Sequence, residues 1–299
     1  MSFKSNFTFT GYRSLKRGNE VFRHPGVVKV SINVKIIKII IRISLVLIVS
    51  ILFFMSCEEE PKLGINSLRF EGDYYLEIPN SASIKSLVAG KYFTIEMWAA
   101  GSSSSPDIAR TLFMVGNNEG GNEIGIYQGP YDSSLVWVYV DDKLFGSFNI
   151  PNLDWRVKKI HYLSLVRVDN FISFYFDGTL RGMKSILDLD LDIGSSNMLI
   201  GADYDPPGVN SNEGNFWYGY IDEVRIWNKD LISTDVEFHY KNPDKLTQHY
   251  SNEGLNNLVG LWRFNNEESE VVPGESGSQN DAYIRGNNSI VYWDTFRAD

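Results

Sequence analysis

Acidic side chains at two places in this 299-residue chain have spacings that suggest carboxylate chemistry. Glu71, Asp73 and Glu77 occupy odd-numbered positions, and alternate residues of a β-strand point to the same face. Retaining glycoside hydrolysis needs two carboxylates about 5 Å apart. The segment from Glu71 to Glu77 is one residue longer than the Glu-x-Asp-x-x-Glu pattern that places such a pair on one strand. We therefore expect no catalytic pair here.

The second acidic pair, Asp222 and Glu223, lies in a segment with a strand pattern. Adjacent residues of a strand point to opposite faces, so these two carboxylates are not expected to converge on one bond. Histidines are few, and His161 at the start of a predicted strand is expected to be packed or hydrogen-bonded. The sequence contains no phosphate loop, nucleophile elbow or zinc signature. We predict no catalytic residues, and the protein is not expected to be an enzyme.

Cys57 is the only cysteine, which excludes an internal disulfide and any site built from several cysteines. Before it lies an uncharged apolar run, residues 43–55, with basic residues on its N-terminal side. A basic flank, a short apolar stretch and a small residue form the layout of a secretory signal peptide. A membrane-spanning helix needs about 20 apolar residues, and this region reaches that length only by including three basic ones. We interpret residues 1–56 as a signal peptide, although its unusual length leaves the true translation start open.

The segment Phe54-Met55-Ser56-Cys57 resembles the lipobox of bacterial lipoproteins, with Phe54 where Leu is usual. The resemblance implies that lipid is joined to Cys57 and that cleavage exposes its amine. Glu58-Glu59-Glu60 resembles the acidic signal that sends some lipoproteins to the outer face of an outer membrane. Residues 57–66 would then form the lipidated end and a linker of at most about 30 Å. We expect a surface-exposed protein, anchored to an outer membrane by its lipid.

Charge separates the two parts of the chain. The whole sequence has 28 Lys and Arg and 37 Asp and Glu, of which residues 1–56 hold nine basic residues and one acid. The remaining 19 basic and 36 acidic residues give a net charge of −17. Such a surface repels nucleic acid and anionic headgroups. We expect no nucleic-acid partner, whereas neutral glycans and divalent cations are compatible with this charge.

Residues 67–299 show a period-two alternation of apolar and polar residues. The clearest runs are Tyr74–Ile78, Phe93–Trp98, Leu135–Val140 and Phe171–Phe176. Short strands separated by turns rich in Gly, Asn and Asp predict an all-β fold, a two-sheet antiparallel β-sandwich. One short helix is expected near Ser233–Tyr240, with Ser233 as its cap and Asp235 in its first turn. A length of this order suits one domain.

Several segments resemble laminin-G-like and pentraxin-like domains, and they occur in the order found in that family. They are Leu68–Pro79, Phe93–Trp98, His161–Arg167, Phe174–Gly178, Gly219–Asn228 and Leu258–Asn265. The resemblance runs from about residue 66 to the end of the chain and implies a concanavalin A-like jelly roll. Most members of the family bind glycans or other extracellular partners. A fold does not establish an activity, so each site is weighed separately.

The same resemblance implies a calcium site at one edge of the sandwich. Asp203 and Asp205 correspond to an acid-x-acid loop, and Asn122 to a ligand in an earlier loop where Gly121 replaces the expected acid. Glu213 is the candidate that completes the set of four, and Asn215 is a further candidate nearby. Carboxylate and carbonyl oxygens suit Ca²⁺, which takes six to eight oxygen ligands. The alternative, ordinary acidic turns on an acidic protein, stays open.

Aromatic residues are the remaining candidates for ligand binding, because their rings stack on the apolar faces of sugars. Trp98, Trp227 and Trp262 lie within strand patterns and are expected in the core. The better candidates for binding are six residues: Tyr131, Tyr204, Trp217, Tyr218, Trp137 and Trp155.

Together these features favour a cell-surface lipoprotein whose non-catalytic, lectin-like domain binds carbohydrate. An adhesive module that recognises a protein partner is the first alternative, and a glycoside-active enzyme is the second.

Overall fold

The computed structural model describes twelve stretches of the chain. They are residues 6–17, 20–31, 66–103, 108–116, 124–130, 133–140, 143–186, 196–203, 215–247, 252–265, 269–286 and 292–294. The chain divides into two compact units, Met1–Glu59 and Glu60–Asp299. Each unit is described by itself below.

The first unit contains an antiparallel hairpin of β1 (Asn6–Arg17) and β2 (Glu20–Ser31). This region is predicted to be part of a leader, and the strands in it are not predicted from the sequence. The apolar run 43–55 and Cys57 lie outside the described residues, so the predicted signal peptide and lipidation site stay predictions. Within the described stretches, no helix is both long enough and apolar enough to span a membrane.

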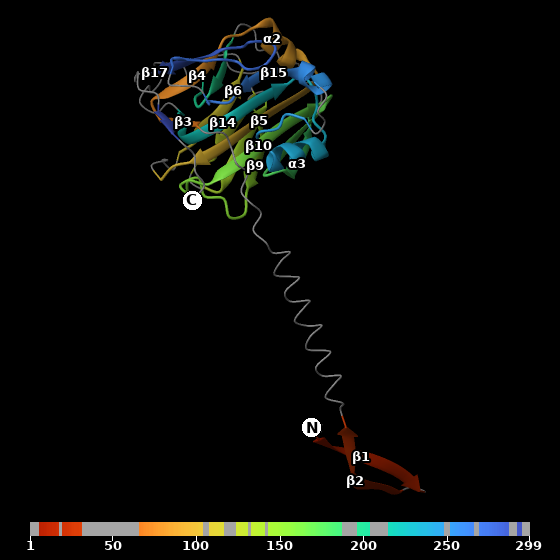
Figure 1. The fold of residues 1–299 in the computed structure, drawn as a ribbon. Helices are drawn as coiled ribbons and strands as arrows, with labels where there is room; N and C mark the ends of the chain where they lie inside the picture. Colours follow the sequence, from red (N-terminus) through yellow and green to blue (C-terminus); the bar gives the residue numbers. More distant parts are fainter. Residues whose placement is uncertain are drawn as a thin grey trace, which may run out of the picture. The chain divides into compact units, whose positions relative to one another are not determined.

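The second unit contains two antiparallel sheets, which confirms the predicted β-sandwich (Figure 1). We name the first sheet I. Its strands in spatial order are β12 (Thr179–Ser185), β11 (Phe171–Phe176), β10 (Ile160–Val168), β5 (Tyr92–Gly101), β14 (Tyr218–Trp227), β3 (Ser67–Glu71) and β18 (Tyr292–Asp294), and β15 (Leu258–Trp262) also pairs with β14.

We name the second sheet II. Its strands in spatial order are β16 (Val271–Val272), β17 (Ala282–Gly286), β4 (Tyr74–Ile78), β13 (Met198–Ile200), β6 (Arg110–Val115), β7 (Ile124–Gln128), β8 (Leu135–Val140) and β9 (Lys143–Asn149). Strands that are neighbours in space come from distant parts of the chain, as in the pairing of β17 with β4.

The main core lies between the two sheets, because apolar side chains at alternate strand positions point inward from both. Phe93, Ile95 and Met97 share this face of β5, as the alternation predicts. Sheet I is also covered on its other face, where a second apolar cluster includes Trp98, Tyr162, Trp227 and Val236 of α3 (Ser233–Lys241). Figure 1 shows α3 beside β10. Strand β5 is therefore buried on both faces, whereas β8 in sheet II alternates between buried and half-buried residues.

In the described part of the domain, two α-helices pack against the sandwich, and only one of them is predicted from the sequence. Helix α3 begins at the predicted Ser233, but its cap is Ile232, which provides no side-chain hydrogen bond. Asp235 lies in its first turn, as predicted. The missed helix is α2 (Ala82–Ala89), whose N-terminus is capped by Ser81, since the Ser81 hydroxyl accepts a hydrogen bond from the backbone N–H of Ile84. The 3₁₀ helix η1 covers Asn252–Asn257.

Candidate functional site

The outer face of sheet II, opposite the core, carries one continuous row of residues across six strands. Strand register pairs Tyr283 with Glu77, Glu77 with Leu199, Leu199 with Met114, Met114 with Gly125 and Gly125 with Tyr139. Residues of the two middle strands, Met114 and Leu199, are only 2% and 4% exposed. Half-buried rings and charged side chains lie toward the two ends of the row, and they form two clusters.

The aromatic cluster consists of Tyr127, Trp137 and Tyr139 on β7 and β8. The rings of Trp137 and Tyr139 are 6.1 Å apart and half-buried, and Tyr127 packs edge-on to Tyr139 at 5.5 Å. The indole N–H of Trp137 donates to Ser147 Oγ at 3.0 Å, which fixes the orientation of its ring. Tyr127 lies against Gly125, where an added Cβ would stand 2.3 Å from the Tyr127 ring. The cluster is thus an oriented, partly open aromatic surface.

The polar cluster consists of Glu77, Asn197 and Arg285 at the opposite end of the same face. Glu77 Oε1 accepts from Asn197 Nδ2 at 2.7 Å, and Oε2 accepts from Arg285 Nε at 2.7 Å. Two tyrosines flank these groups: the Arg285 guanidinium stands 5.2 Å from the ring centre of Tyr283, and Tyr75 pairs with Arg285 in the strand register. Burial, followed by the charge of Glu77, raises the pKa of Tyr75.

The outer face of sheet I is occupied by a buried polar network beneath α3. Glu96 accepts from the indole N–H of Trp227 at 2.7 Å, from Nδ1 of His239 at 2.9 Å and from the hydroxyl of Tyr162. Burial alone would raise the pKa of Glu96. The charge and hydrogen bond of His239, the charge of Arg225 and the Tyr162 hydrogen bond together outweigh burial and lower that pKa to about 2. The network therefore holds α3 on the sheet.

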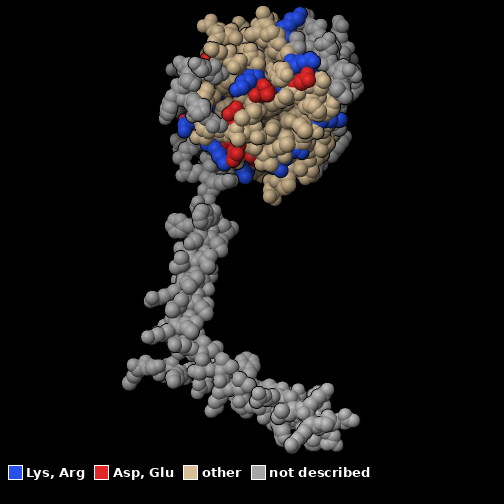
Figure 2. All heavy atoms as spheres, turned by 90° about the vertical axis from the view of Figure 1, so that its right-hand side faces the viewer, with Lys and Arg blue, Asp and Glu red and all other residues tan. Residues whose placement is uncertain are grey.

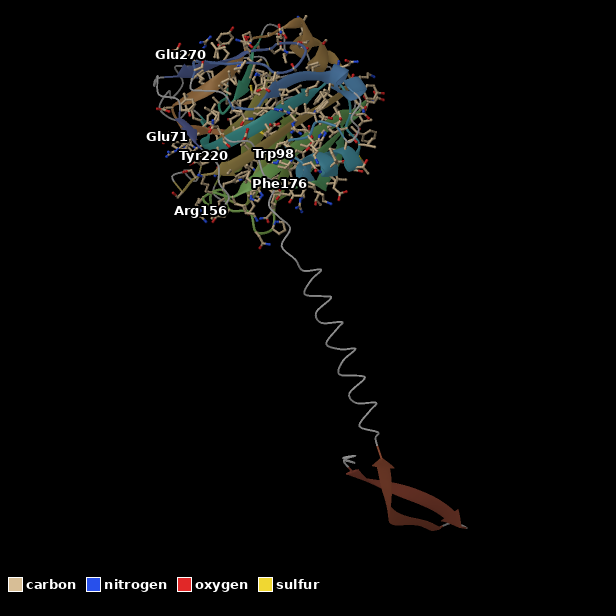
Figure 3. All side chains as sticks on the ribbon, in the orientation of Figure 1. Glu71, Trp98, Arg156, Phe176, Tyr220 and Glu270 are labelled. Carbon is tan, nitrogen blue, oxygen red and sulfur yellow. The ribbon has the colours of Figure 1, made fainter. Side chains whose placement is uncertain are left out.

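Asp222 and Glu223 belong to the same covered region. Asp222 accepts from Ser67 Oγ at 3.0 Å, while Glu223 accepts from Arg225 at 2.9 Å. Glu223 has a φ of 46°, and the register of β14 against β5 shifts here, so the simple alternation predicted for this pair is interrupted by a bulge. Burial, and then the charge of Glu223, raises the pKa of Asp222 well above its usual range. Both carboxylates have structural partners, and Arg225 continues the network, with its guanidinium 4.8 Å from the ring centre of Trp98. Trp98 is labelled in Figure 3.

The expectation that Glu71, Asp73 and Glu77 could share one strand face is wrong. Glu71 ends β3 in sheet I, and Glu77 lies on β4 in sheet II. Gly72 turns the chain between them with a φ of 84°. Because Glu71 and Glu77 lie on strands of different sheets, Asp73 lies in the bend between them, and Glu71 pairs with Arg69 at 2.8 Å, the three acids do not form the one-strand arrangement.

Most of the predicted calcium ligands lie outside the described residues: Asn122, Asp205 and Glu213. Asp203 is described and is half-buried at the end of the segment that follows β13. No group of three or more His, Cys, Asp or Glu residues suited to a metal occurs among the residues that the structure describes. One ligand of four is thus placed, and calcium binding stays a prediction.

The aromatic candidates divide into three groups. Tyr131 and Tyr204 lie outside the described residues. Trp217 is 0% exposed and packs edge-on to Trp155 at 5.3 Å in the main core, so neither ring can stack on an external sugar. Tyr218 is half-buried, but one side of its ring lies against Gly72 and Arg110 stands 4.9 Å from its centre. Trp137 is likewise described and half-buried, and it differs from Tyr218 in lying beside a second half-buried ring, that of Tyr139, on the outer face of sheet II.

Other predictions for single residues are confirmed. Trp98, Trp227 and Trp262 are buried, as expected. His161 is also buried, and its Nδ1 pairs with Asp177 at 2.8 Å. The polar cluster is the feature that sequence reasoning missed, because Glu77 and Arg285 are separated by 208 positions and only the pairing of β4 with β17 joins them.

A family model described as "Concanavalin A-like lectin/glucanases superfamily" matches residues 70–237, which is more than half of the chain. No curated protein matches the sequence. Among solved structures, one from Bacteroides ovatus named as a "putative carbohydrate binding protein" is 15% identical with a TM-score of 0.57. That alignment covers 80% of this chain and 62% of the other, so this chain spans less than two thirds of its length.

Two further structures have lower TM-scores. A native heptameric SAP-like pentraxin from Limulus polyphemus is 14% identical with a TM-score of 0.45, over 60% of this chain and 83% of that chain. The CBM40 of Ruminococcus gnavus IT-sialidase, bound to α2,3-sialyllactose, is 11% identical with a TM-score of 0.44, over 58% of this chain and 98% of that chain.

Proposed function

Because the chain belongs to the concanavalin A-like lectin/glucanase superfamily, we propose that it binds carbohydrate through the outer face of sheet II. The observation that carries the proposal is the aromatic cluster. Trp137 and Tyr139 are half-buried on one face of β8, and Ser147 holds the Trp137 indole in a fixed orientation. An oriented ring loses little side-chain entropy when an apolar sugar face stacks on it.

Sheet II is favoured over sheet I because its outer face carries the half-buried rings of Trp137 and Tyr139, whereas most of the outer face of sheet I is covered and its exposed residues lie at one end. On sheet I, α3 and the polar network around Glu96 cover the corresponding surface. The strand patterns agree with this assignment, since β8 alternates between buried and half-buried residues and β5 is buried along almost its whole length.

An uncharged glycan is the expected ligand class. Residues 57–299 carry a net charge of −17, which repels anionic polymers and, on the same ground, nucleic acid. On the side of the domain seen in Figure 2, described Lys, Arg, Asp and Glu residues lie in small groups of mixed sign among uncharged atoms. Four carboxylates that sequence patterns single out as catalytic candidates have structural partners, which supports a binding role without catalysis: Glu71, Glu77, Asp222 and Glu223.

The proposal includes display at a membrane surface. Cys57 and the acidic residues after it support lipid anchoring, and the linker to β3 keeps the domain within about 30 Å of the lipid. Cys57→Ala is expected to leave the domain folded and to release it into the soluble fraction. If the variant stays in the membrane with its leader uncut, the apolar segment is a true span and the anchor proposal is wrong.

Calcium is proposed as a separate property of the segment that contains Asp203. Its carboxylate has the oxygen chemistry that calcium prefers, and its three predicted co-ligands lie outside the described residues. Glycan binding that is lost with a chelator and restored by added calcium would support this role. If glycan binding is insensitive to chelator and to Asp203→Ala, the proposed role of calcium is wrong, and the proposal for the aromatic cluster is unaffected.

A glycan array tests the proposed function. The wild-type protein should bind a set of uncharged glycans, and Trp137→Ala should reduce that binding at least tenfold. Tyr92→Ala is the matched control, because Tyr92 is an aromatic residue that is 49% exposed on sheet I. Loss of binding in both variants, or in neither, would contradict the assignment to sheet II.

One observation favours recognition of a protein as the second candidate function. Exposed apolar residues gather at one end of sheet I, where strand register joins Tyr92 to Val168 and Val168 to Phe171. Strand β12 ends the spatial order of this sheet, and its Met183 is exposed. Absence of glycan binding, together with a protein ligand that Phe171→Ser no longer binds, would favour this candidate.

A further inference from the structure

We propose that the polar cluster of Glu77, Asn197 and Arg285 is a second ligand subsite, which binds a pair of neighbouring hydroxyl groups on an uncharged sugar. The inference rests on the proposed function, because it concerns the same outer face of sheet II. It adds a second contact region to the aromatic cluster and names the class of sugar that this region accepts.

The side chain of Arg285 is held in place before any ligand binds. Its Nε donates to Glu77 Oε2 at 2.7 Å, and its guanidinium stands 5.2 Å from the ring centre of Tyr283. An isolated ion pair at a surface contributes little, since two long side chains must be ordered to form it. Here strand pairing of β4 with β17 and the tyrosine ring already restrict both partners, so Arg285 binds a ligand at a lower entropic cost.

Glu77 is fixed from its other side as well. Its Oε1 accepts from Asn197 Nδ2 at 2.7 Å, and Asn197 Oδ1 accepts from the backbone N–H of Asn80 at 2.9 Å. This chain of hydrogen bonds ties the carboxylate to the backbone after β4. The position of Glu77 is therefore set by residues from three separate segments of the chain.

The cluster retains hydrogen-bonding capacity in both directions. Among the described residues, Arg285 uses only its Nε in a hydrogen bond or ion pair, and its side chain is 47% exposed. Its two terminal nitrogens are available as donors. A carboxylate has about four lone-pair sites, and the described partners of Glu77 use two of them. One hydroxyl can accept from Arg285 while its neighbour donates to Glu77.

Charge selects an uncharged ligand over an acidic one. The carboxylate of Glu77 offsets the guanidinium of Arg285, so the pair attracts a carboxylate ligand far less than an unpaired arginine does. The net charge of −17 on residues 57–299 further disfavours anions. A neutral vicinal diol matches the donors and acceptors without a charge that needs compensation.

The two clusters are too far apart for one sugar ring. In sheet II, three strand steps separate Tyr127 on β7 from Glu77 on β4, and five separate β8 from β17, which corresponds to about 14 Å and about 24 Å. A monosaccharide can therefore occupy only one cluster, whereas an oligosaccharide can contact both. Rings flank each cluster, with Tyr75 and Tyr283 beside the polar groups.

The test uses the full-length protein and a glycan array that carries matched uncharged and carboxylate-bearing oligosaccharides. Three variants are compared with the wild type: Arg285→Lys, which keeps the charge but loses the guanidinium; Glu77→Gln, which keeps the shape but leaves Arg285 uncompensated; and Arg181→Lys, a control on β12 of sheet I. Thermal melting confirms that each variant is folded.

Arg285→Lys should weaken binding of the uncharged glycans about tenfold or more, because a lysine ammonium cannot both hold the Glu77 pair and present the fork of guanidinium donors to the ligand. Glu77→Gln should shift the preference toward the carboxylate-bearing member of each pair, and Arg181→Lys should change neither. One result would overturn the subsite alone: the wild type binds uncharged glycans, Trp137→Ala abolishes that binding, and Arg285→Lys and Glu77→Gln bind as the wild type does. The proposed function would then stand. Wild-type preference for carboxylate-bearing glycans would also overturn the subsite. If the wild type binds no glycan at all, the proposed function itself has failed.

Discussion

Nδ1 of His239 on α3 lies 2.9 Å from Oε1 of Glu96 on β5, and the two side chains are 2% and 0% exposed. The other ring nitrogen, Nε2, lies 3.2 Å from the backbone oxygen of Leu246. A carboxylate and a carbonyl both accept hydrogen bonds, so the ring of His239 lies between two acceptors. This buried pair attaches α3 to the outer face of sheet I.

His239→Ala should lower the free energy of unfolding by about 3–5 kcal/mol, because it leaves the carboxylate of Glu96 buried without its main partner. Urea unfolding at neutral pH measures the change. Lys241→Ala is the control on the same helix, since the exposed pair of Lys241 with Glu237 should contribute no more than about 0.5 kcal/mol. Similar losses in the two variants would show that the buried pair does not hold α3.

Stability should fall in acid partly through Glu96. Its folded-state pKa of about 2 lies below its usual value, so its contribution is present above about pH 4.5 and is lost as the pH falls toward 2. The separation corresponds to about 3 kcal/mol. The stability difference between the wild type and Glu96→Gln, measured by urea unfolding from pH 6 to pH 2.5, should shrink over this range. A difference that does not vary with pH would contradict the assignment.

Ionisation of Asp222 should change stability with pH in the direction opposite to that of Glu96. Burial raises its pKa above the unfolded value, so the folded protein binds more protons and stability falls as the pH rises through this interval. Asp222→Asn removes the ionisable group and can retain hydrogen bonds to Ser67 and to the backbone N–H of Glu223. The variant should therefore gain stability relative to the wild type between pH 4 and pH 7 in urea unfolding. A constant offset between the two proteins would count against a raised pKa.

Period-two alternation predicts the sandwich well, but it cannot tell whether a strand has one or two covered faces. The pattern places Phe93, Ile95 and Met97 in the core, where they lie. The intervening Glu96 is also buried, because it meets His239, which is 143 positions away. Such a contact has no local signal. Helix α2 is different, since Ser81 before Ala82–Ala89 is an N-cap signal that could have revealed it.

The candidate site was only partly accessible to sequence reasoning for the same reason. Trp137 stands out by residue type and by its place in an alternating strand, and it lies on the open face. Trp217 has the same chemistry but lies in the core beside Trp155. Glu77 and Arg285 meet only because β17 pairs with β4, and residue type alone gives no indication of that pairing.

The absence of a side chain at Gly125 should determine where the ring of Tyr127 lies in the aromatic cluster. A Cβ at this position would stand 2.3 Å from the ring of Tyr127, so Gly125→Ala should displace Tyr127 and weaken glycan binding severalfold. Gly277→Ala is the matched control, because nothing lies within 4 Å of its added Cβ. Calorimetric titration with the array-selected glycan measures both. Unchanged affinity in a folded Gly125→Ala variant would mean that the arrangement of Tyr127 does not matter for binding.

The most direct test of carbohydrate binding through sheet II is a crystal structure of the protein with a bound uncharged oligosaccharide selected on the array. We predict a sugar ring in contact with Trp137, with carbon atoms within about 4.5 Å of the indole. The neighbouring Tyr139 should border the same sugar. An oligosaccharide bound elsewhere, with the outer face of sheet II empty, would contradict the account.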